Sequence, residues 1–376
     1  MDFTRSSEQE MMRDSARRYL SDDFSMRRRN EESTKEAKWH GYAELGWLAL
    51  MAPEDVGGLG GDIADVLILV EEMGRALSLQ PYVASGILAT RLVACTADGA
   101  QRLDLLATMI SGEQRLAPAL YEPGRRYSLV PETRAKETDS GYQLSGKKCL
   151  IAGGAGADGF LVSAQLDSGS VGLFLVKAGH PSVIASFYST IDDGDMADAQ
   201  FKNVNLDCQD LLGIVSAEMF ENALDEARLA LCADTLGALE AAVQITADYL
   251  KTRKQFGQPL SNFQALQHSL VEMYIEVDAM RSSLFNAIAA FHQGERARRR
   301  RAVASCWVKI FDAARGVAGM AIHLHGGIGM TAEYPVGHYL RRIMVSERSF
   351  GDVEFHLESY IAFSASDPER QAVASL

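Results

Sequence analysis

The sequence predicts three consecutive domains: an all-α N-terminal domain, a middle β-barrel or sandwich, and a C-terminal antiparallel four-helix bundle. Helical periodicity fills the first third, short strand-like runs follow, and long helical patterns fill the remainder. We place the domains at residues 1–113, 114–213 and 214–376. A chain of 376 residues is long enough for this organisation.

The N-terminal region has apolar residues at three- and four-residue steps, which places them on one helix face. The clearest such set is Ile63, Val66, Leu67, Val70, Met73 and Leu77. The middle region has short β-type runs with Asp139-Ser140-Gly141 as a hairpin turn between the first two. These runs are residues 129–136, 142–151, 160–165, 171–176 and 199–203. Strands without intervening helices predict a small antiparallel barrel or sandwich.

The C-terminal region predicts long helices over residues 218–251, 262–292 and 297–325. The pattern breaks at Gly257–Pro259 and restarts after Ser261. Long helices with short joints favour an antiparallel bundle.

The bulk composition is typical of a soluble cytosolic protein, with 47% hydrophobic and 23% charged residues. A net charge of −13 argues against nucleic-acid binding. The apolar runs are too short to span a bilayer, and residues 1–10 contain no signal-peptide core. Five scattered cysteines without a C-x-x-C pair predict reduced thiols. We expect a cytoplasmic protein with no membrane span.

Two basic clusters, Arg27–Arg29 and Arg298–Arg301, stand out from this acidic background. We interpret both as solvated helix ends, with a contact to a CoA phosphate as the alternative.

Two motifs invite functional readings that the context does not support. Residues 154–159 match G-x-G-x-x-G, but the next run predicts a strand and not the helix that a dinucleotide fingerprint requires. His323 and His325 are two residues apart on a predicted helix, so they do not share a face that could chelate a metal. We expect no metal site.

Two segments remain as a candidate ligand grip. In one, Arg253 and Phe256 sit at a helix end and Gln264 opens the next helix. In the other, a helix ends at Gly326-Gly327, where the backbone can approach a ligand closely. Arginine pairs bidentately with phosphate oxygens, so the pair of segments fits a nucleotide diphosphate. The alternative is a helix joint in which Arg253 only caps carbonyl groups.

In this order and spacing, the motifs resemble the acyl-CoA dehydrogenase family over nearly the whole chain. The N-terminal matches are Pro53-Glu54-x-x-Gly57-Gly58 and Glu71-Glu72-Met73-Gly74-Arg75, and Glu122-Pro123-Gly124 opens the middle domain. The C-terminal matches are Arg253-Lys254-Gln255-Phe256-Gly257, Phe263-Gln264 and Gly326-Gly327-x-Gly329.

This resemblance implies α,β-dehydrogenation of an acyl-CoA thioester with FAD as hydride acceptor and an electron-transferring flavoprotein as electron acceptor. In the family, a neighbouring subunit holds the adenine and pyrophosphate end of each FAD. The matching positions in this sequence are Arg253, Phe256, Gln264, His323, Gly326 and Gly327. His323 replaces the usual glutamine and keeps a hydrogen-bond donor.

The positions that supply the catalytic glutamate in the family are empty here. The usual one precedes a glycine late in the bundle, where this sequence has Phe350 before Gly351. The alternative one precedes an arginine on the first bundle helix, where Ala227 precedes Arg228. Glu226 is one residue away, which turns it about 100° around the helix.

The flavin-facing residues of the middle domain also differ from the family. Tyr121 replaces the threonine before Glu122, and Leu150 and Ala152 replace the Trp-x-Thr that contacts the flavin ring. Groups that serve a flavin in this chain's own cleft are mostly lost, whereas those that reach a neighbour's flavin are mostly kept.

That asymmetry resembles the small, non-catalytic subunits of heteromeric acyl-CoA dehydrogenases of the pimeloyl-CoA or steroid side-chain type. It implies an α2β2 complex with a second acyl-CoA dehydrogenase subunit, acting on a bulky or functionalised acyl-CoA. One alternative is a complete homo-oligomeric enzyme whose base is relocated to Glu226 or Asp225. Another is a non-enzymatic scaffold that has lost flavin.

Overall fold

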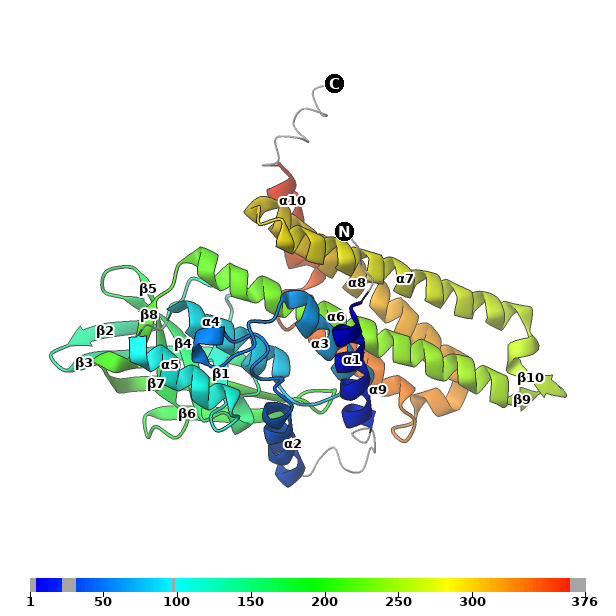
Figure 1. The fold of residues 1–376 in the computed structure, drawn as a ribbon, viewed down its shortest axis with the longest axis horizontal. Coiled ribbons are helices and arrows are strands. Elements are labelled where there is room, and N and C mark those ends of the chain that lie inside the picture. The colour runs from blue at the N-terminus through cyan, green and yellow to red at the C-terminus, as the bar shows by residue number, and fades with distance from the viewer. Residues whose placement is uncertain (1–4, 22–31, 97–98, 366–376) are drawn as a thin grey trace, which may run out of the picture. The chain divides into compact units, whose positions relative to one another are not determined.

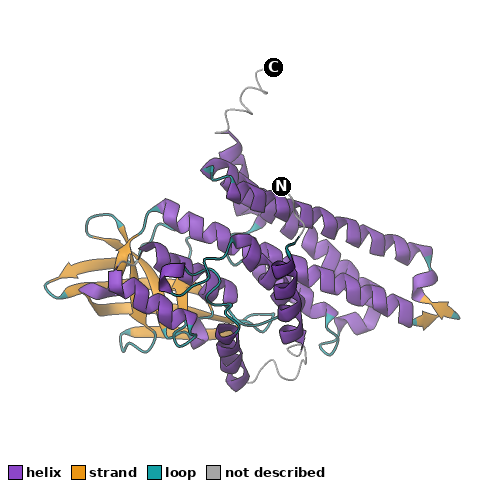
Figure 2. Cartoon of the chain, viewed as in Figure 1, coloured by secondary structure: helices purple, strands orange, loops and turns teal. Residues whose placement is uncertain are grey.

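The computed structural model describes residues 5–21, 32–96 and 99–365 (Figure 1). The chain forms two compact units. The first combines α1 (Ser7–Ser21) and residues 63–78 with the chain from Arg228 onwards, and the second contains the strands. Helices, then strands, then helices follow one another as predicted (Figure 2).

The first unit is a helical bundle whose long members are α6, α7 and α8, with α9 and α10 packed against α8. Their bounds are α3 (Ile63–Arg75), α6 (Ala217–Thr252), α7 (Gln264–His292), α8 (Arg296–His325), α9 (Val336–Ser346) and α10 (Val353–Ala365). The predicted helices are confirmed to within two residues at each end.

Helices α3 and α6 cross at two glycines. A Cβ at Gly74 would lie 1.9 Å from the carbonyl oxygen of Asp234, and one at Gly237 would lie 1.9 Å from that of Glu71. No side chain fits at such distances, so these glycines allow the two backbones to touch. Gly74 of the predicted motif is therefore a packing residue.

The acidic residues of the same motif lie in a network of ion pairs. Glu71 accepts hydrogen bonds of 2.9 and 3.2 Å from Arg281, which also binds Glu240. Glu72, 1% exposed, binds Arg17 at 2.6 Å. Because buried carboxylates need such partners, the motif ties α1 and α3 into the bundle and supplies no chemistry.

Helix α6 is, in the part of the chain that the structure describes, the one helix long and apolar enough to cross a membrane by composition. The apolar window is 83% buried. Burial of that extent is typical of the core helix of a globular domain. The first turns of α6 belong to the second unit, and the helix continues into the first.

The second unit is built on an eight-stranded sheet. The strands are β1 (Leu116–Ala119), β2 (Arg134–Thr138), β3 (Gly141–Ala152), β4 (Gly159–Leu166), β5 (Val171–Lys177), β6 (Val183–Ser189), β7 (Asp195–Asp207) and β8 (Leu211–Ile214). Its helices are α2 (Glu32–Glu44), α4 (Thr90–Thr96) and α5 (Gly99–Ile110), with a π-helix at Tyr82–Ala89.

The prediction of a purely antiparallel sheet is wrong at one point. Strand β4 pairs with β1 and β2 in parallel, while the other pairings are antiparallel. The first predicted run, residues 129–136, also begins too early, since β2 starts at Arg134. Parallel strands need long connections. Strands β1 and β4 are joined by residues 120–158, which include β2 and β3, so local patterns do not reveal their pairing.

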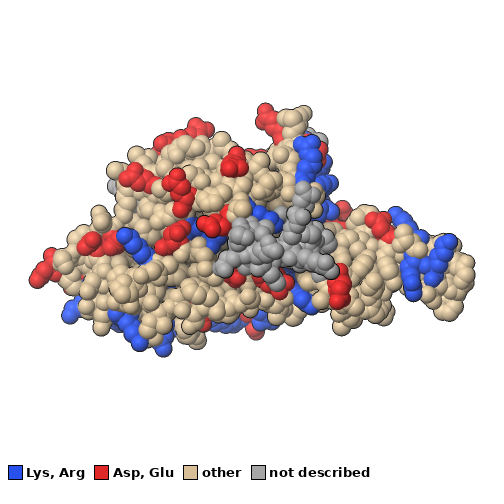
Figure 3. Space-filling model, turned by 90° about the horizontal axis from the view of Figure 1, so that it is seen from below, with Lys and Arg blue, Asp and Glu red and all other residues tan. Residues whose placement is uncertain are grey.

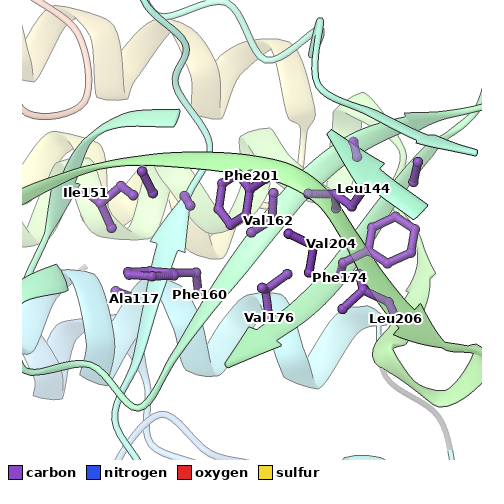
Figure 4. Close-up of a cluster of buried hydrophobic side chains, with 14 of the residues drawn as sticks. Ala117, Leu144, Ile151, Phe160, Val162, Phe174, Val176, Phe201, Val204 and Leu206 are labelled. Carbon is purple, nitrogen blue, oxygen red and sulfur yellow. The ribbon is translucent and has the colours of Figure 1, made fainter. Parts of the chain in front are cut away.

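The core of this unit lies on the inner face of the sheet (Figure 4). Phe160, Phe174 and Phe201 come from three strands and are 2% exposed or less. The rings of Phe160 and Phe201 meet edge to face at 6.5 Å. Burial of each such ring contributes roughly 1.5–3 kcal/mol, so the sheet is a stable support for the residues on β3.

Candidate functional site

The Arg253 segment forms a tight turn between α6 and α7. Strands β9 (Lys254–Gln255) and β10 (Gln258–Pro259) pair as a short hairpin, and Leu260 N–H donates to the Arg253 carbonyl at 2.8 Å. Figure 1 shows this hairpin where α6 ends and α7 begins. The predicted helix break is confirmed, and the hairpin presents its tip at the surface.

The side chains of Arg253 and Phe256 are exposed, and the Phe256 ring meets Phe263 edge to face at 6.1 Å. The guanidinium of Arg253 forms no hydrogen bond or ion pair with any residue in the described ranges. Phe256 is 89% exposed and has a φ of 52°, a left-handed backbone that costs a bulky residue energy. Arg253 therefore does not cap a helix, and the alternative reading of this motif is wrong. An exposed cation beside an exposed ring is suited to an external ligand.

The remaining predicted residues end or begin helices of the same unit. Gln264 is exposed in the first turn of α7, and His323 is exposed in the last turn of α8. Gly326 has φ 64° and ψ −141°, a region open essentially only to glycine. A Cβ at Gly326 or Gly327 would have no atom within 4 Å, so this backbone is open to a ligand.

A ring stack joins the two segments. Tyr249, one turn before Arg253, stacks on His325 with ring centroids 4.5 Å apart. The His325 ring also meets Tyr334 at 4.9 Å. The structure thus brings the ends of α6 and α8 together, as the nucleotide reading requires. The sequence gives no signal for this contact, because Tyr249 and His325 lie on different helices far apart in the chain.

The metal reading fails on geometry. His323 is exposed whereas His325 is 3% exposed, so the two rings occupy different faces of α8. Over the residues that the structure describes, no group of three or more His, Cys, Asp and Glu could hold an ion.

Phe350, which the family resemblance places at the usual position of the catalytic base, is 7% exposed in the first unit. Its carbonyl oxygen accepts hydrogen bonds from Arg228 Nε at 3.1 Å and His356 Nε2 at 3.2 Å. The His356 ring stacks on Trp307 at 4.5 Å. Burial, with the charges of Arg228 and Arg300, holds the pKa of His356 well below its ordinary value. The Phe350 carbonyl is therefore bound by side chains of the chain itself.

The alternative base position lies in the second unit. Ala227 is fully buried and has no acceptor group. Glu226 accepts a 2.6 Å hydrogen bond from Arg91 Nε. An adjacent cation stabilises a carboxylate and makes it a weaker base, so the ion pair disfavours Glu226 as a relocated base. Asp225 is 1% exposed.

Leu150, which replaces the tryptophan expected from the family resemblance, lies at a bulge on β3. The register of β3 against β7 shifts between Lys148 and Ile151, and Leu150 takes a φ of 55° with 48% of its surface exposed. Asp198 Oδ1 accepts from Leu150 N–H and from Tyr188 O–H, both at 3.0 Å. The backbone donor at the bulge is therefore already paired within the chain.

Tyr121 and Glu122 form hydrogen bonds that hold the strand β3 and its neighbours together. Cys149 N–H donates to the Tyr121 carbonyl at 2.9 Å. Glu122 accepts from the backbone of Glu132 and Thr133 and from Lys148 Nζ at 2.8 Å. The Glu-Pro-Gly motif is thus a structural anchor, and Ala152 at the end of β3 adds no polar group.

The glycine motif of the middle region has no helix after it. Gly154–Gly156 is a short 3-10 turn followed by β4, as predicted.

The basic cluster on α8 packs partly on aromatic rings. Arg299 lies over Phe291 and Arg300 over Phe363, at 5.2 and 5.4 Å, so the cluster packs on rings as well as facing solvent. Arg27–Arg29 lie outside the described residues. Figure 3 shows acidic and basic side chains interspersed on the face it presents.

Comparison with known proteins gives the class and then the family. Residues 6–113 match the acyl-CoA dehydrogenase N-terminal domain, and residues 217–363 match the acyl-CoA dehydrogenase C-terminal domain. The class is that of oxidoreductases, and the chain belongs to the acyl-CoA dehydrogenase family. Acyl-CoA dehydrogenase FadE27 of Mycobacterium tuberculosis is 30% identical over 322 residues, which cover 83% of this chain and 84% of that protein.

Two solved complexes are similar over almost the full length. The Tcur3481-Tcur3483 steroid acyl-CoA dehydrogenase variant is 31% identical with a TM-score of 0.84, covering 96% of this chain and 98% of its own. The ChsE4-ChsE5 complex from Mycobacterium tuberculosis is 26% identical with a TM-score of 0.88, covering 98% and 100%. The predicted fold is confirmed, and the family supports FAD as the cofactor.

The residues of the first unit fit one end of that cofactor. An unpaired guanidinium, an exposed ring and an open Gly-Gly turn suit a diphosphate joined to a planar base. The β3 bulge of the second unit fits less well, because Leu150 and Ala152 offer no polar side-chain group and the Leu150 N–H is bound to Asp198. The segments at Arg253 and Gly326 thus suit a cofactor better than the β3 bulge does.

Proposed function

We propose that this chain is the non-catalytic subunit of an FAD-dependent acyl-CoA dehydrogenase. In this proposal it binds the nucleotide end of an FAD whose flavin ring lies in a second acyl-CoA dehydrogenase subunit, in an α2β2 complex. The contributing residues are Arg253, Phe256, Gln264, His323, Gly326 and Gly327. The partner supplies the catalytic glutamate.

The observation that carries the proposal is the contrast between the two sets of residues. Phe350 and Ala227 are buried apolar residues at the positions where a base is needed. Arg253, in contrast, has no partner in the described chain. We expect this combination, no base at either position and an Arg253 that is free to bind phosphate, in a subunit that binds the cofactor of another active site.

A bound FAD would supply the acceptor for the β-hydride of the acyl-CoA, and a carboxylate of the partner would remove the α-proton. Arg253 binds phosphate oxygens through its guanidinium, and Phe256 provides a face for the adenine. The open backbone at Gly326 and Gly327 lets the diphosphate approach closely. Electrons then leave to an electron-transferring flavoprotein, and we place the whole complex in the cytoplasm.

For the substrate, we infer a bulky or functionalised acyl-CoA, such as a steroid side-chain or dicarboxylyl thioester. The support is the likeness to a steroid acyl-CoA dehydrogenase at 31% identity over 96% of this chain. The absence of a base from this subunit also fits a heterodimer in which only the cleft of the partner subunit carries out the reaction.

The test is to purify the chain alone and together with a co-expressed partner that carries the family's glutamate. We expect little flavin and no dehydrogenation with the chain alone, and one FAD per heterodimer with activity for the pair. A yellow and fully active preparation of this chain alone would contradict the proposal and favour a relocated base. A pair without flavin would favour the scaffold reading.

A further inference from the structure

His325 lies between two tyrosine rings in the first unit. Its ring stacks on Tyr249 at 4.5 Å with an interplanar angle of 28°, and it meets Tyr334 at 4.9 Å and 52°. Tyr249 comes from the last turn of α6, and Tyr334 precedes α9. The imidazole therefore joins three segments that are distant in sequence.

The protonation of this ring follows from its contacts. The carbonyl of Ala321 accepts a 2.7 Å hydrogen bond from His325 Nδ1, so Nδ1 carries the proton. The other nitrogen, Nε2, is buried and has no hydrogen-bond partner within the described ranges. Burial lowers the pKa of His325, so at neutral pH the ring is uncharged and acts as an aromatic plate.

The stack sets the relative placement of the two binding segments. Arg253 follows Tyr249 by one helical turn, and Gly326 directly follows His325. The Arg253 guanidinium has no other anchor in the described chain, and no atom surrounds the Cβ position of Gly326. The ring contact thus links the helix end that carries Arg253 to the one that carries Gly326.

We propose that His325 is a positioning residue for the FAD nucleotide: its stack on Tyr249 and Tyr334 holds the Gly326–Gly327 turn in register with Arg253. This inference rests on the proposed function. In this proposal His325 contacts neither substrate nor cofactor. Its positioning effect depends on the flat aromatic ring and not on its nitrogens.

Two substitutions separate the ring from its nitrogens. His325→Phe keeps an aromatic plate, and His325→Ala removes it. In the co-expressed complex we expect the FAD dissociation constant to rise about tenfold or more for His325→Ala, and to stay within about threefold of wild type for His325→Phe. FAD binding is measured by flavin fluorescence at a temperature well below the unfolding midpoint of each variant.

Asp234→Asn is the control for simple loss of stability. Asp234 pairs with Arg342 at 3.0 Å in the same unit and away from the ring stack. We expect this variant to lower the thermal midpoint and leave the FAD dissociation constant unchanged. Equal FAD loss in Asp234→Asn and His325→Ala would overturn the inference, as would equal loss in His325→Phe and His325→Ala.

Arg253→Ala distinguishes this inference from the proposed function. If Arg253→Ala weakens FAD binding and His325→Ala does not, the positioning role is wrong and the proposed function stands. If neither changes FAD binding, the proposed function itself fails. We further expect the FAD dissociation constant of the Arg253→Ala/His325→Ala double variant to rise by less than the product of the two single-variant factors. Both substitutions act on the placement of one guanidinium.

Discussion

Arg91 Nε donates a hydrogen bond of 2.6 Å to Glu226 Oε2, and this ion pair occupies the carboxylate nearest to a known base position. Because the cation favours the charged form, we expect Glu226→Gln to leave the dehydrogenase rate of the complex within about twofold of wild type. Loss of a true general base lowers the rate by roughly 10²–10⁴-fold. Steady-state kinetics with a saturating acyl-CoA distinguish these results.

Arg91→Gln is the matched variant for this prediction. It breaks the same ion pair and leaves Glu226 in place, so any effect on folding is shared by both variants. A rate loss of 100-fold or so in Glu226→Gln alone would establish Glu226 as the base and return the chain to the class of complete enzymes.

Arg253 is exposed and has no partner in the described chain. We expect Arg253→Ala to weaken FAD binding by the complex by roughly 10–150-fold, since a hydrogen bond to a charged group contributes about 1.5–3 kcal/mol. The thermal midpoint of the free chain stays unchanged because the Arg253 side chain forms no hydrogen bond or ion pair with the residues that the structure describes. Equilibrium dialysis of FAD gives the affinity.

Arg298→Ala is its control, because Arg298 is also exposed but lies in the first turns of α8. We expect this variant to bind FAD as wild type does. Arg253→Lys should lie between wild type and alanine, since lysine keeps the charge without the bidentate fork. Wild-type affinity in Arg253→Ala would count against the cofactor role.

Lys148 is fully buried with Glu122 at 2.8 Å and Ser163 Oγ at 3.0 Å. Burial lowers the pKa of Lys148 to about 8, while Glu122 opposes this shift. We expect Lys148→Met to reduce the free energy of unfolding by about 3–5 kcal/mol, because it leaves a buried carboxylate without its cation. Urea denaturation of the free chain measures it.

The double variant with Glu122→Gln tests that cause. Glu122→Gln removes the charge and keeps an acceptor for one of the two backbone N–H groups, while its amide nitrogen faces the other. It should therefore restore no more than roughly 1–3 kcal/mol relative to Lys148→Met alone. Lys309→Met breaks a partly exposed pair with Glu276 and should cost no more than about 1 kcal/mol. A double variant less stable than Lys148→Met would show that charge burial is not the source of the loss.

His356 is buried, and its pKa is held well below the ordinary value by burial and by Arg228 and Arg300. The unfolded chain therefore binds a proton that the folded chain does not. Stability from this group is complete above the unfolded pKa of about 6.5 and is lost as pH falls below it. The loss approaches about 1.4 kcal/mol for each pH unit.

We expect His356→Gln to flatten the fall in unfolding free energy between pH 7 and 5, since glutamine keeps a donor for the Phe350 carbonyl but does not titrate. His40→Gln, at an exposed site, should keep the wild-type slope. Identical slopes in wild type and His356→Gln would mean that folding does not change the protonation of His356 in this range.

Much of the fold follows from the sequence pattern because helix periods extend over many turns. The ends of α6, α7 and α8 are predicted within two residues. Strands β1 and β8 have only four residues each, too few to show a clear period, and most of the seven residues of β6 are exposed, so no buried face marks it. The parallel pairing of β4 depends on contacts across the chain. Local patterns do not contain that information.

For the site, Arg253, Phe256 and the Gly326-Gly327 turn are predicted from motif spacing, and the structure brings their helix ends together through Tyr249 and His325. The ring stack itself is not predictable, because it joins residues 76 positions apart. The Arg91–Glu226 pair joins residues 135 positions apart, so only the structure weakens the relocated-base alternative.

The most direct test of the central claim is the amount of FAD bound by the chain alone and by the co-purified pair. The account predicts a colourless, inactive chain and a pair with one FAD per heterodimer, whose flavin is lost with Arg253→Ala. One FAD per chain with full dehydrogenase activity in the absence of a partner would contradict it.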